Sequence, residues 1–192
     1  MKWNRAIEEY RNYLVLEKAL SNNTVDSYIN DVQNLKSFCI DHINIQSCRE
    51  VNIDTLRAFL VMLNKTSRSS KSQARIISGM TSFFDYLTLE NLIETNPCRQ
   101  LDRPKYERKL PDTLSQDEIN TILKSIDLSK KHGERNRTIV ETLYSCGLRV
   151  SELVNLKCSN LFLKDSYMIV VGKGYKQRLI PLNKTIKKYL RN

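Results

Sequence analysis

Hydrophobic residues recur at helical spacing through the first half of the chain. They fall three or four positions apart, the period at which one face of an α-helix meets a core. The clearest stripe consists of Val25, Tyr28, Ile29, Val32, Leu35, Phe38 and Cys39. Three other stretches show the same period: before residue 20, after Asn52, and over residues 69–89. Ser21 or Asn22 is a suitable N-cap for the second helix, and Asn52 for the third. The pattern predicts four antiparallel helices joined by short links, which form a compact bundle.

The helical pattern is interrupted at Asn96, because the proline that follows it disfavours helix at the preceding residue. The next stretch, CRQLDRPKYERKLPDTL, has two prolines, five basic residues and no periodicity. Such a composition is typical of an exposed linker between two domains. We therefore expect a helical domain over residues 1–98, a linker over residues 99–112 and a second domain over residues 113–192.

Residues 113–192 show a helical period first and a strand period later. Ser115 and Glu118 match a capping box, which predicts a helix start. A second helix should run from about residue 135 to residue 145 and end at Gly147, since glycine is favoured just after a helix C-terminus. Three short apolar runs separated by turns predict an antiparallel β-meander over residues 161–163, 167–171 and 178–182. Short helices are expected over residues 150–156 and 184–190. The expected fold class is mainly α with a small antiparallel β-meander.

The charge is distributed unevenly along the chain. Residues 1–100 hold 12 Lys/Arg against 11 Asp/Glu, a net of +1, whereas residues 101–192 hold 19 against 10, a net of +9. This asymmetry suggests that the second half meets a polyanion, although a basic surface that only aids solubility remains an alternative. In the first half, the stretch NKTSRSSKSQAR carries Lys65, Arg68, Lys71 and Arg75 among hydroxyl groups. Cations and hydroxyls both suit phosphate contacts, but an ordinary solvated helix face fits this stretch equally well.

Several classes of protein are disfavoured by composition. No apolar run approaches the roughly 20 residues that span a bilayer, and the N-terminus carries glutamates in place of a signal-peptide core. A cytoplasmic protein without membrane contact is expected. The five cysteines are scattered without a CxxC motif, and His42 and His132 stand alone. Neither a zinc site nor a disulfide framework is expected, and the cysteines should be reduced and mostly buried.

The stretch YSCGLRVSEL places a charged residue, Arg149, among apolar ones. It follows the helix-ending Gly147 and precedes the carboxylate Glu152 by three residues. We expect apolar neighbours to desolvate the guanidinium partly, so that it can bind a phosphate bidentately while the carboxylate fixes its orientation. Taken alone, a simple ion pair between residues i and i+3 at a helix start explains the motif equally well.

A second stretch, VVGKGYKQRLIPL, places Lys173 between two glycines at a predicted hairpin tip. Glycine permits a tight turn that lies close to a ligand, and Lys176 and Arg178 add charge beside it. The spacing is not that of a P-loop, and the stretch joins strand to strand. By itself this hairpin is also consistent with an ordinary exposed turn.

The two motifs together, with Arg149 and Lys173 24 residues apart, resemble those of tyrosine recombinases and integrases, in particular the Xer-type recombinases. In that family a helix with LYxxGLRVSEL precedes a hairpin with GKGxKxRxxPL. The stretches LSNNTVDSYINDVQNLKSF, SRSSKSQARIISGMTSFFDYLTLENLIETNPC and KLPDTLSQDEI also resemble family segments, so the likeness covers essentially the whole chain. It implies a four-helix SAM-like core-binding domain followed by the first part of an α+β catalytic domain.

The resemblance also implies a role for each motif residue. Arg149 would hold the non-bridging oxygens of the scissile phosphate, Lys173 would protonate the departing 5′-oxygen, and Glu152 would orient Arg149. By the same resemblance, the chemistry would proceed through a 3′-phosphotyrosyl intermediate, with no metal or cofactor. Double-stranded DNA would lie in a clamp formed by both domains. The expected DNA-binding residues are Arg68, Lys71, Arg75, Lys176 and Arg178. The other partners would be recombinase protomers, identical or sister proteins, in a tetramer on paired DNA sites.

The sequence departs from the family after the hairpin. The family's pattern continues with a His-x-x-Arg segment, a further His or Trp and a nucleophilic tyrosine, but both histidines here precede Arg149. We expect the chain to be the first two-thirds of a recombinase that binds DNA without completing strand exchange. A non-catalytic, architectural DNA-binding module is the alternative, and RNA binding is a weaker one. Chromosome-dimer resolution and integration, excision or inversion by a mobile element all stay open.

Overall fold

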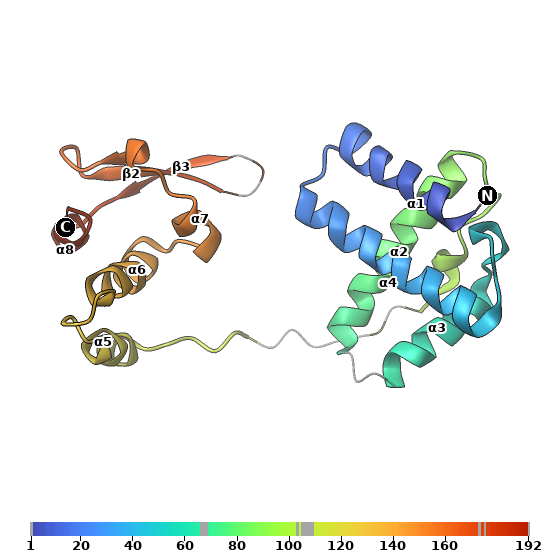
Figure 1. The fold of residues 1–192 in the computed structure, drawn as a ribbon, viewed down its shortest axis with the longest axis horizontal. Helices are drawn as coiled ribbons and strands as arrows, with labels where there is room; N and C mark the ends of the chain where they lie inside the picture. Colours follow the sequence, from blue (N-terminus) through green and yellow to red (C-terminus); the bar gives the residue numbers. More distant parts are fainter. Residues whose placement is uncertain are drawn as a thin grey trace. The chain divides into compact units, whose positions relative to one another are not determined.

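The computed structural model describes residues 2–65, 69–102, 104, 110–172, 174 and 176–191. Contacts divide the chain into two compact units, Met1–Lys109 and Leu110–Asn192 (Figure 1). Among the described residues, no helix combines the length and the apolar character that crossing a bilayer requires.

The first unit contains the four expected helices within its described residues. They are α1 (Trp3–Asn12), α2 (Asn22–Ile43), α3 (Ile53–Lys65) and α4 (Ser70–Leu89), with a π-helical turn η1 (Tyr13–Glu17) and the 3-10 turns η2 (Cys48–Glu50) and η3 (Pro97–Gln100). The Asn52 side chain caps α3 as predicted, because its Oδ1 accepts a bond from the Thr55 N–H at 2.9 Å. Ser21 precedes α2, but its side chain makes no capping bond.

The core of the first unit forms where α1, α2, α3 and α4 pack together. Helix α4 lies along α2 (Figure 1), and the apolar stripe of each helix is buried between them. The Trp3 ring stacks on Phe83 with centroids 6.3 Å apart. Tyr10 is fully buried, yet its hydroxyl donates to Ser82 Oγ at 2.8 Å, which satisfies the polar end of the ring. The periodic positions of the sequence therefore account for most of this core, although Tyr28 of the α2 stripe is only half-buried.

The second unit begins with helices, continues into the expected antiparallel meander and closes with a short helix. Its elements are α5 (Gln116–Ser125), α6 (Gly133–Cys146), α7 (Val150–Val154), the 3-10 turn η4 (Cys158–Asn160), β1 (Leu161–Phe162), β2 (Tyr167–Val171), β3 (Gln177–Pro181) and α8 (Lys184–Tyr189). The strands follow the order β1-β2-β3. The capping box is confirmed: Ser115 Oγ accepts from the Glu118 N–H, and the Glu118 carboxylate accepts from the Ser115 N–H at 2.7 Å.

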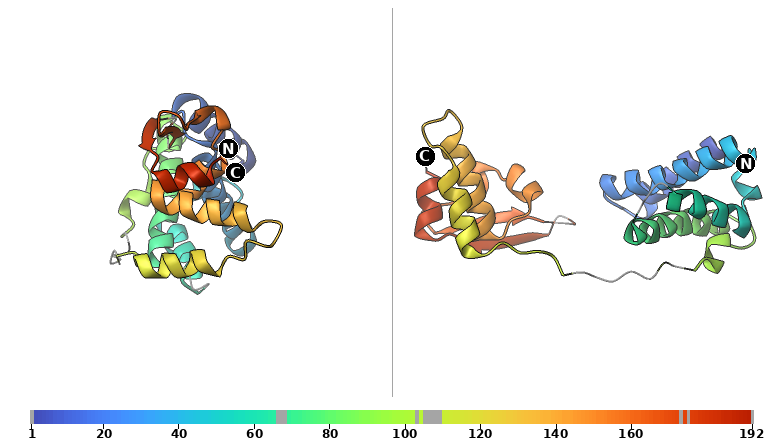
Figure 2. Two further views of the ribbon diagram at one scale, coloured as in Figure 1. Left: turned by 90° about the vertical axis from the view of Figure 1, so that its left-hand side faces the viewer. Right: turned by 90° about the horizontal axis from the view of Figure 1, so that it is seen from below.

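One face of the small sheet is buried against helices. Alternate residues of the strands point inward, so Met168, Val170 and Ile180 join Leu148 and Ile186 in a single cluster. Helices α5 and α6 lie on one side of the sheet (Figures 1 and 2). The register pairs Val170 on β2 with Arg178 on β3. This pairing fixes the position of Arg178 along the sheet.

The cysteines of the chain are free, and Cys39, Cys48 and Cys98 are buried. Burial raises the pKa of the Cys39 thiol to about 12 and does the same for Cys98. The expectation that most cysteines behave as small buried hydrophobes is therefore confirmed for these three, while Cys146 is half-buried and Cys158 exposed.

Candidate functional site

The candidate site begins at the junction between α6 and α7. Gly147 ends α6 with a φ of +59°, a left-handed conformation that glycine adopts at little cost. The chain then anchors Leu148, which is 8% exposed, in the core of the second unit. Arg149 follows in extended conformation, with φ −75° and ψ 150°, as the residue that precedes α7. The turn therefore places this arginine at the surface directly beyond a buried anchor.

Glu152 holds Arg149 at two points. Its Oε2 accepts a bond from the Arg149 backbone N–H at 2.8 Å, and its Oε1 accepts one from Arg149 Nη1, also at 2.8 Å. The carboxylate side chain is only 3% exposed. Backbone and side chain of Arg149 are thus both bound to one buried carboxylate.

Arg178, on β3, is the second arginine bound to Glu152. Its Nη1 donates to Oε1 at 2.7 Å and its Nη2 donates to Oε2 at 2.8 Å, a bidentate pair between residues 26 positions apart. Gly172, just after β2, lies against this pair: a Cβ at that position would be 3.3 Å from Glu152 Oε1 and 3.4 Å from Arg178 Nη1. Three elements, α7, β2 and β3, therefore converge on one carboxylate.

The two arginines keep this carboxylate ionised. Hydrogen bonds from Arg178 are the largest cause, followed by the Arg149 N–H, and together they lower the pKa of Glu152 to about 2 despite its desolvation. The same contact raises the pKa of Arg178. Two guanidinium groups and one carboxylate leave the cluster with one net positive charge, which suits an anionic ligand.

Arg149 is far more exposed than the sequence suggested. Its side chain is 68% exposed, and its neighbour Val150 is 66% exposed. The expectation that apolar neighbours partly desolvate the guanidinium is wrong, because Val150, the next residue, is exposed, whereas Leu148 turns into the core. Among the described residues, the structure shows one side-chain acceptor for Arg149, the Glu152 oxygen that Nη1 contacts. The remaining guanidinium edge faces solvent and can bind a phosphate.

The other predicted residues of the hairpin are only partly described. Lys173 lies outside the described residues. Lys176 is exposed, and its backbone carbonyl accepts a bond from the Gly172 N–H at 2.8 Å. This bond closes the base of the hairpin between β2 and β3.

In the first unit, the basic residues predicted to bind DNA have different environments. Arg68 lies outside the described residues, and Lys71 is exposed on α4. Arg75 binds Asp31 on α2 bidentately, with distances of 2.8 and 2.7 Å, and its Nη1 also contacts Ser27 Oγ at 2.6 Å. Asp31 is fully buried, so Arg75 balances a charge inside the bundle. Sequence reasoning missed this pair, although a carboxylate next to Val32 in the buried stripe of α2 signals that a cation must meet it.

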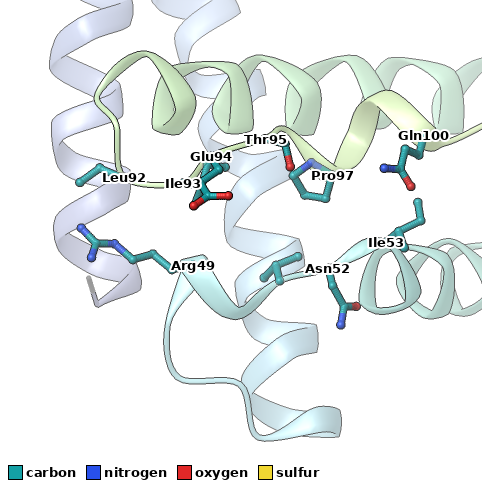
Figure 3. Close-up of a pocket in the computed structure, with 10 residues that line it drawn as sticks. Arg49, Asn52, Ile53, Leu92, Ile93, Glu94, Thr95, Pro97 and Gln100 are labelled. Atoms are coloured by element: carbon teal, nitrogen blue, oxygen red, sulfur yellow. The ribbon is translucent and has the colours of Figure 1, made fainter.

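A cavity of about 440 Å³ lies in the first unit, between the start of α3 and the segment that leads from α4 into η3 (Figure 3). It is lined by Arg49, Val51, Asn52, Ile53, Leu92, Ile93, Glu94, Thr95, Pro97 and Gln100. Its one base and one acid give it little net charge, and none of the predicted site residues lines it. Within the described ranges, no group of three or more His, Cys, Asp or Glu residues is placed to hold a metal ion.

Two family models match the chain. Residues 7–91 match "Phage integrase, N-terminal SAM-like domain", and residues 112–192 match "Phage integrase family". Among curated proteins, the chain is 38% identical over 187 residues to tyrosine recombinase XerD of Staphylococcus epidermidis, which covers 97% of this chain and 63% of that protein. It is also 38% identical over 185 residues to tyrosine recombinase XerD of Oceanobacillus iheyensis, over 96% of this chain and 62% of that protein. The chain thus spans less than two thirds of the length of these relatives.

Solved structures share the fold. A lambda integrase (75–356) dimer bound to a COC′ core site matches with a TM-score of 0.78 at 20% identity, over 100% of this chain and 68% of that one. The Tn1549 transposon integrase in complex with a circular intermediate DNA matches with a TM-score of 0.69 at 16% identity, over 97% of this chain and 63% of that one. The fold, the two family models and the Xer-type relatives agree, and the chain belongs to the phage integrase family of tyrosine recombinases.

Proposed function

We propose that this chain is the DNA-binding and phosphate-binding part of a site-specific recombinase that breaks and rejoins DNA. One observation carries the proposal: Arg149 is fixed by Glu152 through its backbone and through Nη1, yet its side chain is 68% exposed. A guanidinium held in this way is preorganised for an anion. The XerD relatives and the DNA-bound integrases of the same fold support DNA as the anion.

In the proposed reaction, Arg149 binds non-bridging oxygens of the scissile phosphate. Charge grows on these oxygens as a nucleophile adds to phosphorus, so a fixed guanidinium stabilises the transition state more than the ground state. Glu152 is ionised throughout the neutral range, since its pKa is lowered to about 2. It therefore keeps Arg149 in place during the reaction without exchanging a proton.

The proposed cleavage step forms one bond and breaks another. The oxygen of a deprotonated tyrosine attacks phosphorus, the bond from phosphorus to the 5′-oxygen breaks, and Lys173 gives its proton to that oxygen. The 3′-phosphotyrosyl link conserves the bond for rejoining. Both histidines of the sequence precede Arg149, so we propose that the 192 residues alone bind DNA without completing strand exchange.

DNA contacts are proposed for both units. Lys71 is exposed on α4 and Lys176 is exposed at the hairpin, so either ammonium group is available to a phosphate. Arg68 remains a prediction from the sequence. Arg75 and Arg178 are 47% and 39% exposed, but each is bound to a carboxylate, so we propose that they contribute less to DNA binding than the exposed lysines. A clamp of both units around a duplex, assembled with further protomers of the same or a sister recombinase, completes the proposal.

The binding part can be tested on the 192-residue chain with a fluorescently labelled duplex. Affinity should fall steeply with salt, because each neutralised phosphate releases counterions and adds about 0.9 to the log–log slope. Arg149→Ala should reduce that slope by about one. Lys164→Ala, which removes an exposed charge in the turn between β1 and β2, is the matched control and should leave the slope unchanged. Affinity that is insensitive to salt would contradict the proposal.

The catalytic part is tested on the chain completed with the remaining segments of the Staphylococcus epidermidis relative. With a duplex that is nicked near a selected binding site, so that rejoining is prevented, a covalent protein–DNA adduct should accumulate. Arg149→Ala should abolish the adduct, and Lys164→Ala should not. An undiminished amount of adduct in the Arg149→Ala variant would contradict the proposed role of Arg149 in cleavage.

A further inference from the structure

The carboxylate of Glu152 uses both oxygens to hold groups from different elements. The Arg149 backbone and side chain approach it from the start of α7, and Arg178 approaches it from β3. Gly172 packs against the same pair: a Cβ at this residue would lie 3.3 Å from Glu152 Oε1 and 3.4 Å from Arg178 Nη1. Contacts this close are tighter than side-chain packing normally allows, so the absence of a side chain at residue 172 lets the hairpin base approach the pair.

We propose that Arg178 is a positioning residue, which ties the hairpin that carries Lys173 to the carboxylate that holds Arg149. The inference rests on the proposed function and deepens it, because it assigns to Arg178 a role other than DNA contact. In this arrangement a single carboxylate binds both Arg149 and the strand that follows the hairpin.

The backbone of the hairpin supports this role. Val170 pairs with Arg178 and Val171 pairs with Gln177, and the Gly172 N–H then donates to the Lys176 carbonyl at 2.8 Å. Lys173 is the next residue in the sequence, and consecutive Cα atoms are about 3.8 Å apart. The contacts that fix Gly172 therefore fix the point from which the chain continues into Lys173.

The geometry disfavours Arg178 as a phosphate ligand. Both of its terminal nitrogens are bound to Glu152, whereas the Arg149 guanidinium binds this carboxylate through Nη1 alone. The exposed fractions agree, at 39% for Arg178 and 68% for Arg149. If Arg178 turned to DNA, a carboxylate that is 3% exposed would lose its bidentate partner, which is costly for a buried charge.

A sulfur substitution in the DNA separates positioning from binding. When the 5′-bridging oxygen at the cleavage site is replaced by sulfur, the leaving group is a thiolate. Because the pKa of the corresponding thiol is only about 8.5, the thiolate departs without a proton donor. A defect that arises from a misplaced Lys173 should then disappear. A defect in phosphate binding should remain.

In the cleavage assay above, Arg178→Lys should keep the charge and lose the bidentate geometry. We expect the rate on ordinary DNA to fall about 100-fold, the usual effect of a misplaced catalytic group. The rate on the sulfur-containing duplex should return to within about threefold of the unmodified protein. Lys173→Ala should be rescued in the same way and Arg149→Ala should not. DNA affinity of the Arg178 variant should change by less than about threefold.

Two results would overturn the inference: no rescue of Arg178→Lys by sulfur, or a loss of DNA affinity as large as its loss of rate. They differ from a failure of the proposed function, in which the unmodified protein forms no adduct or Arg149→Ala cleaves normally.

A measurement on the 192-residue chain is independent of catalysis. The Gly172 amide should exchange with solvent about tenfold faster in Arg178→Lys, and also in the milder Gly172→Ala, but not in Lys164→Ala. Unchanged exchange in both hairpin variants would equally refute the tie between β3 and the hairpin base.

Discussion

Each unit of this chain contains a buried carboxylate bound by arginine, but the two arrangements have different consequences. In the first unit, Asp31 on α2 binds Arg75 through both oxygens. In the second unit, Glu152 binds Arg178 through both oxygens and also holds Arg149 through one side-chain nitrogen. The pair of Asp31 and Arg75 therefore has no net charge, whereas Glu152 organises a cluster with one surplus positive charge.

The difference separates arginines that neutralise a carboxylate from the arginine that we propose to bind a phosphate. Bidentate pairing with a buried carboxylate occupies the terminal nitrogens of Arg75 and Arg178, whose side chains are 47% and 39% exposed. Arg149 keeps a 68% exposed side chain while its backbone N–H and Nη1 are fixed. A guanidinium suited to phosphate is thus one that the protein orients without neutralising.

The largest effect on stability is expected from Arg75→Ala. The substitution removes the arginine that balances the fully buried carboxylate of Asp31, so the first unit should lose about 3 kcal/mol of unfolding free energy. Urea unfolding followed by the fluorescence of Trp3, the single tryptophan, reports on this unit alone. Lys71→Ala, an exposed charge on the same helix, should change the free energy by less than about 0.5 kcal/mol. Equal effects of the two variants would show that Arg75 is a surface residue like Lys71.

A smaller loss is expected from Gly79→Ala, which tests the space around the same pair. A Cβ at residue 79 would clash with Asp31 Oδ2, and overpacking of this kind typically costs about 1–3 kcal/mol. Alanine gains about 1 kcal/mol over glycine in a helix, so the net loss should be about 1 kcal/mol. In an Asp31→Ala background the clash disappears, and the same substitution should stabilise the unit. Trp3 fluorescence measures both; stabilisation in the unmodified background would contradict the packing argument.

Acid should weaken the second unit through Glu152. The pKa of this group is about 2 in the folded protein against about 4.5 when it is unfolded. A group with a lowered folded-state pKa contributes its stability above the unfolded value and loses it as the pH falls towards the folded value. Stability should therefore decline between about pH 5 and pH 2, as measured by amide exchange at Val170 and Ile180. Glu152→Gln cannot titrate and should show a shallower decline; an identical pH profile would exclude this carboxylate as the cause.

The smallest effect is expected from Arg149→Ala. Glu152 keeps its bidentate bonds to Arg178, and the backbone N–H of residue 149 still caps α7, so stability should change by less than about 0.5 kcal/mol. Arg178→Ala should cost clearly more in the same amide-exchange measurement. If the two substitutions were equally damaging, Arg149 would be as structural as Arg178 and the distinction between the two would fail.

Much of the fold could be predicted because the signals are local. The helical stripes, the Asn52 cap, the capping box of Ser115 and Glu118, and the stop at Gly147 each depend on residues within one or two turns of each other. The meander also follows from short apolar runs and the turns between them. The exposure of individual side chains was harder to predict. Ile122 in α5 and Tyr144 in α6 are hydrophobic residues of helices, yet they are 38% and 49% exposed. Periodicity identifies a face, but what covers that face is decided by other parts of the molecule.

The candidate site was predicted in part. The contact between Glu152 and Arg149 spans three residues and can be read from spacing alone. The partners of Arg75 and Arg178 lie 44 and 26 residues away, so nothing local distinguishes these arginines from exposed basic residues such as Lys71. The sequence consequently grouped all of them as DNA-binding residues.

By itself, the sequence determined the helices, the strands and the two motifs of a tyrosine recombinase, because hydrogen bonding and side-chain periodicity within a segment depend on neighbouring residues. Only the tertiary structure decided which arginines pair with carboxylates far away in the sequence, as Arg75 and Arg178 do. Burial of Asp31 and Glu152 requires helices and strands to pack, and a buried carboxylate then selects the arginine that the fold brings within reach. The same packing leaves Arg149 oriented and exposed, which the order of residues alone does not specify.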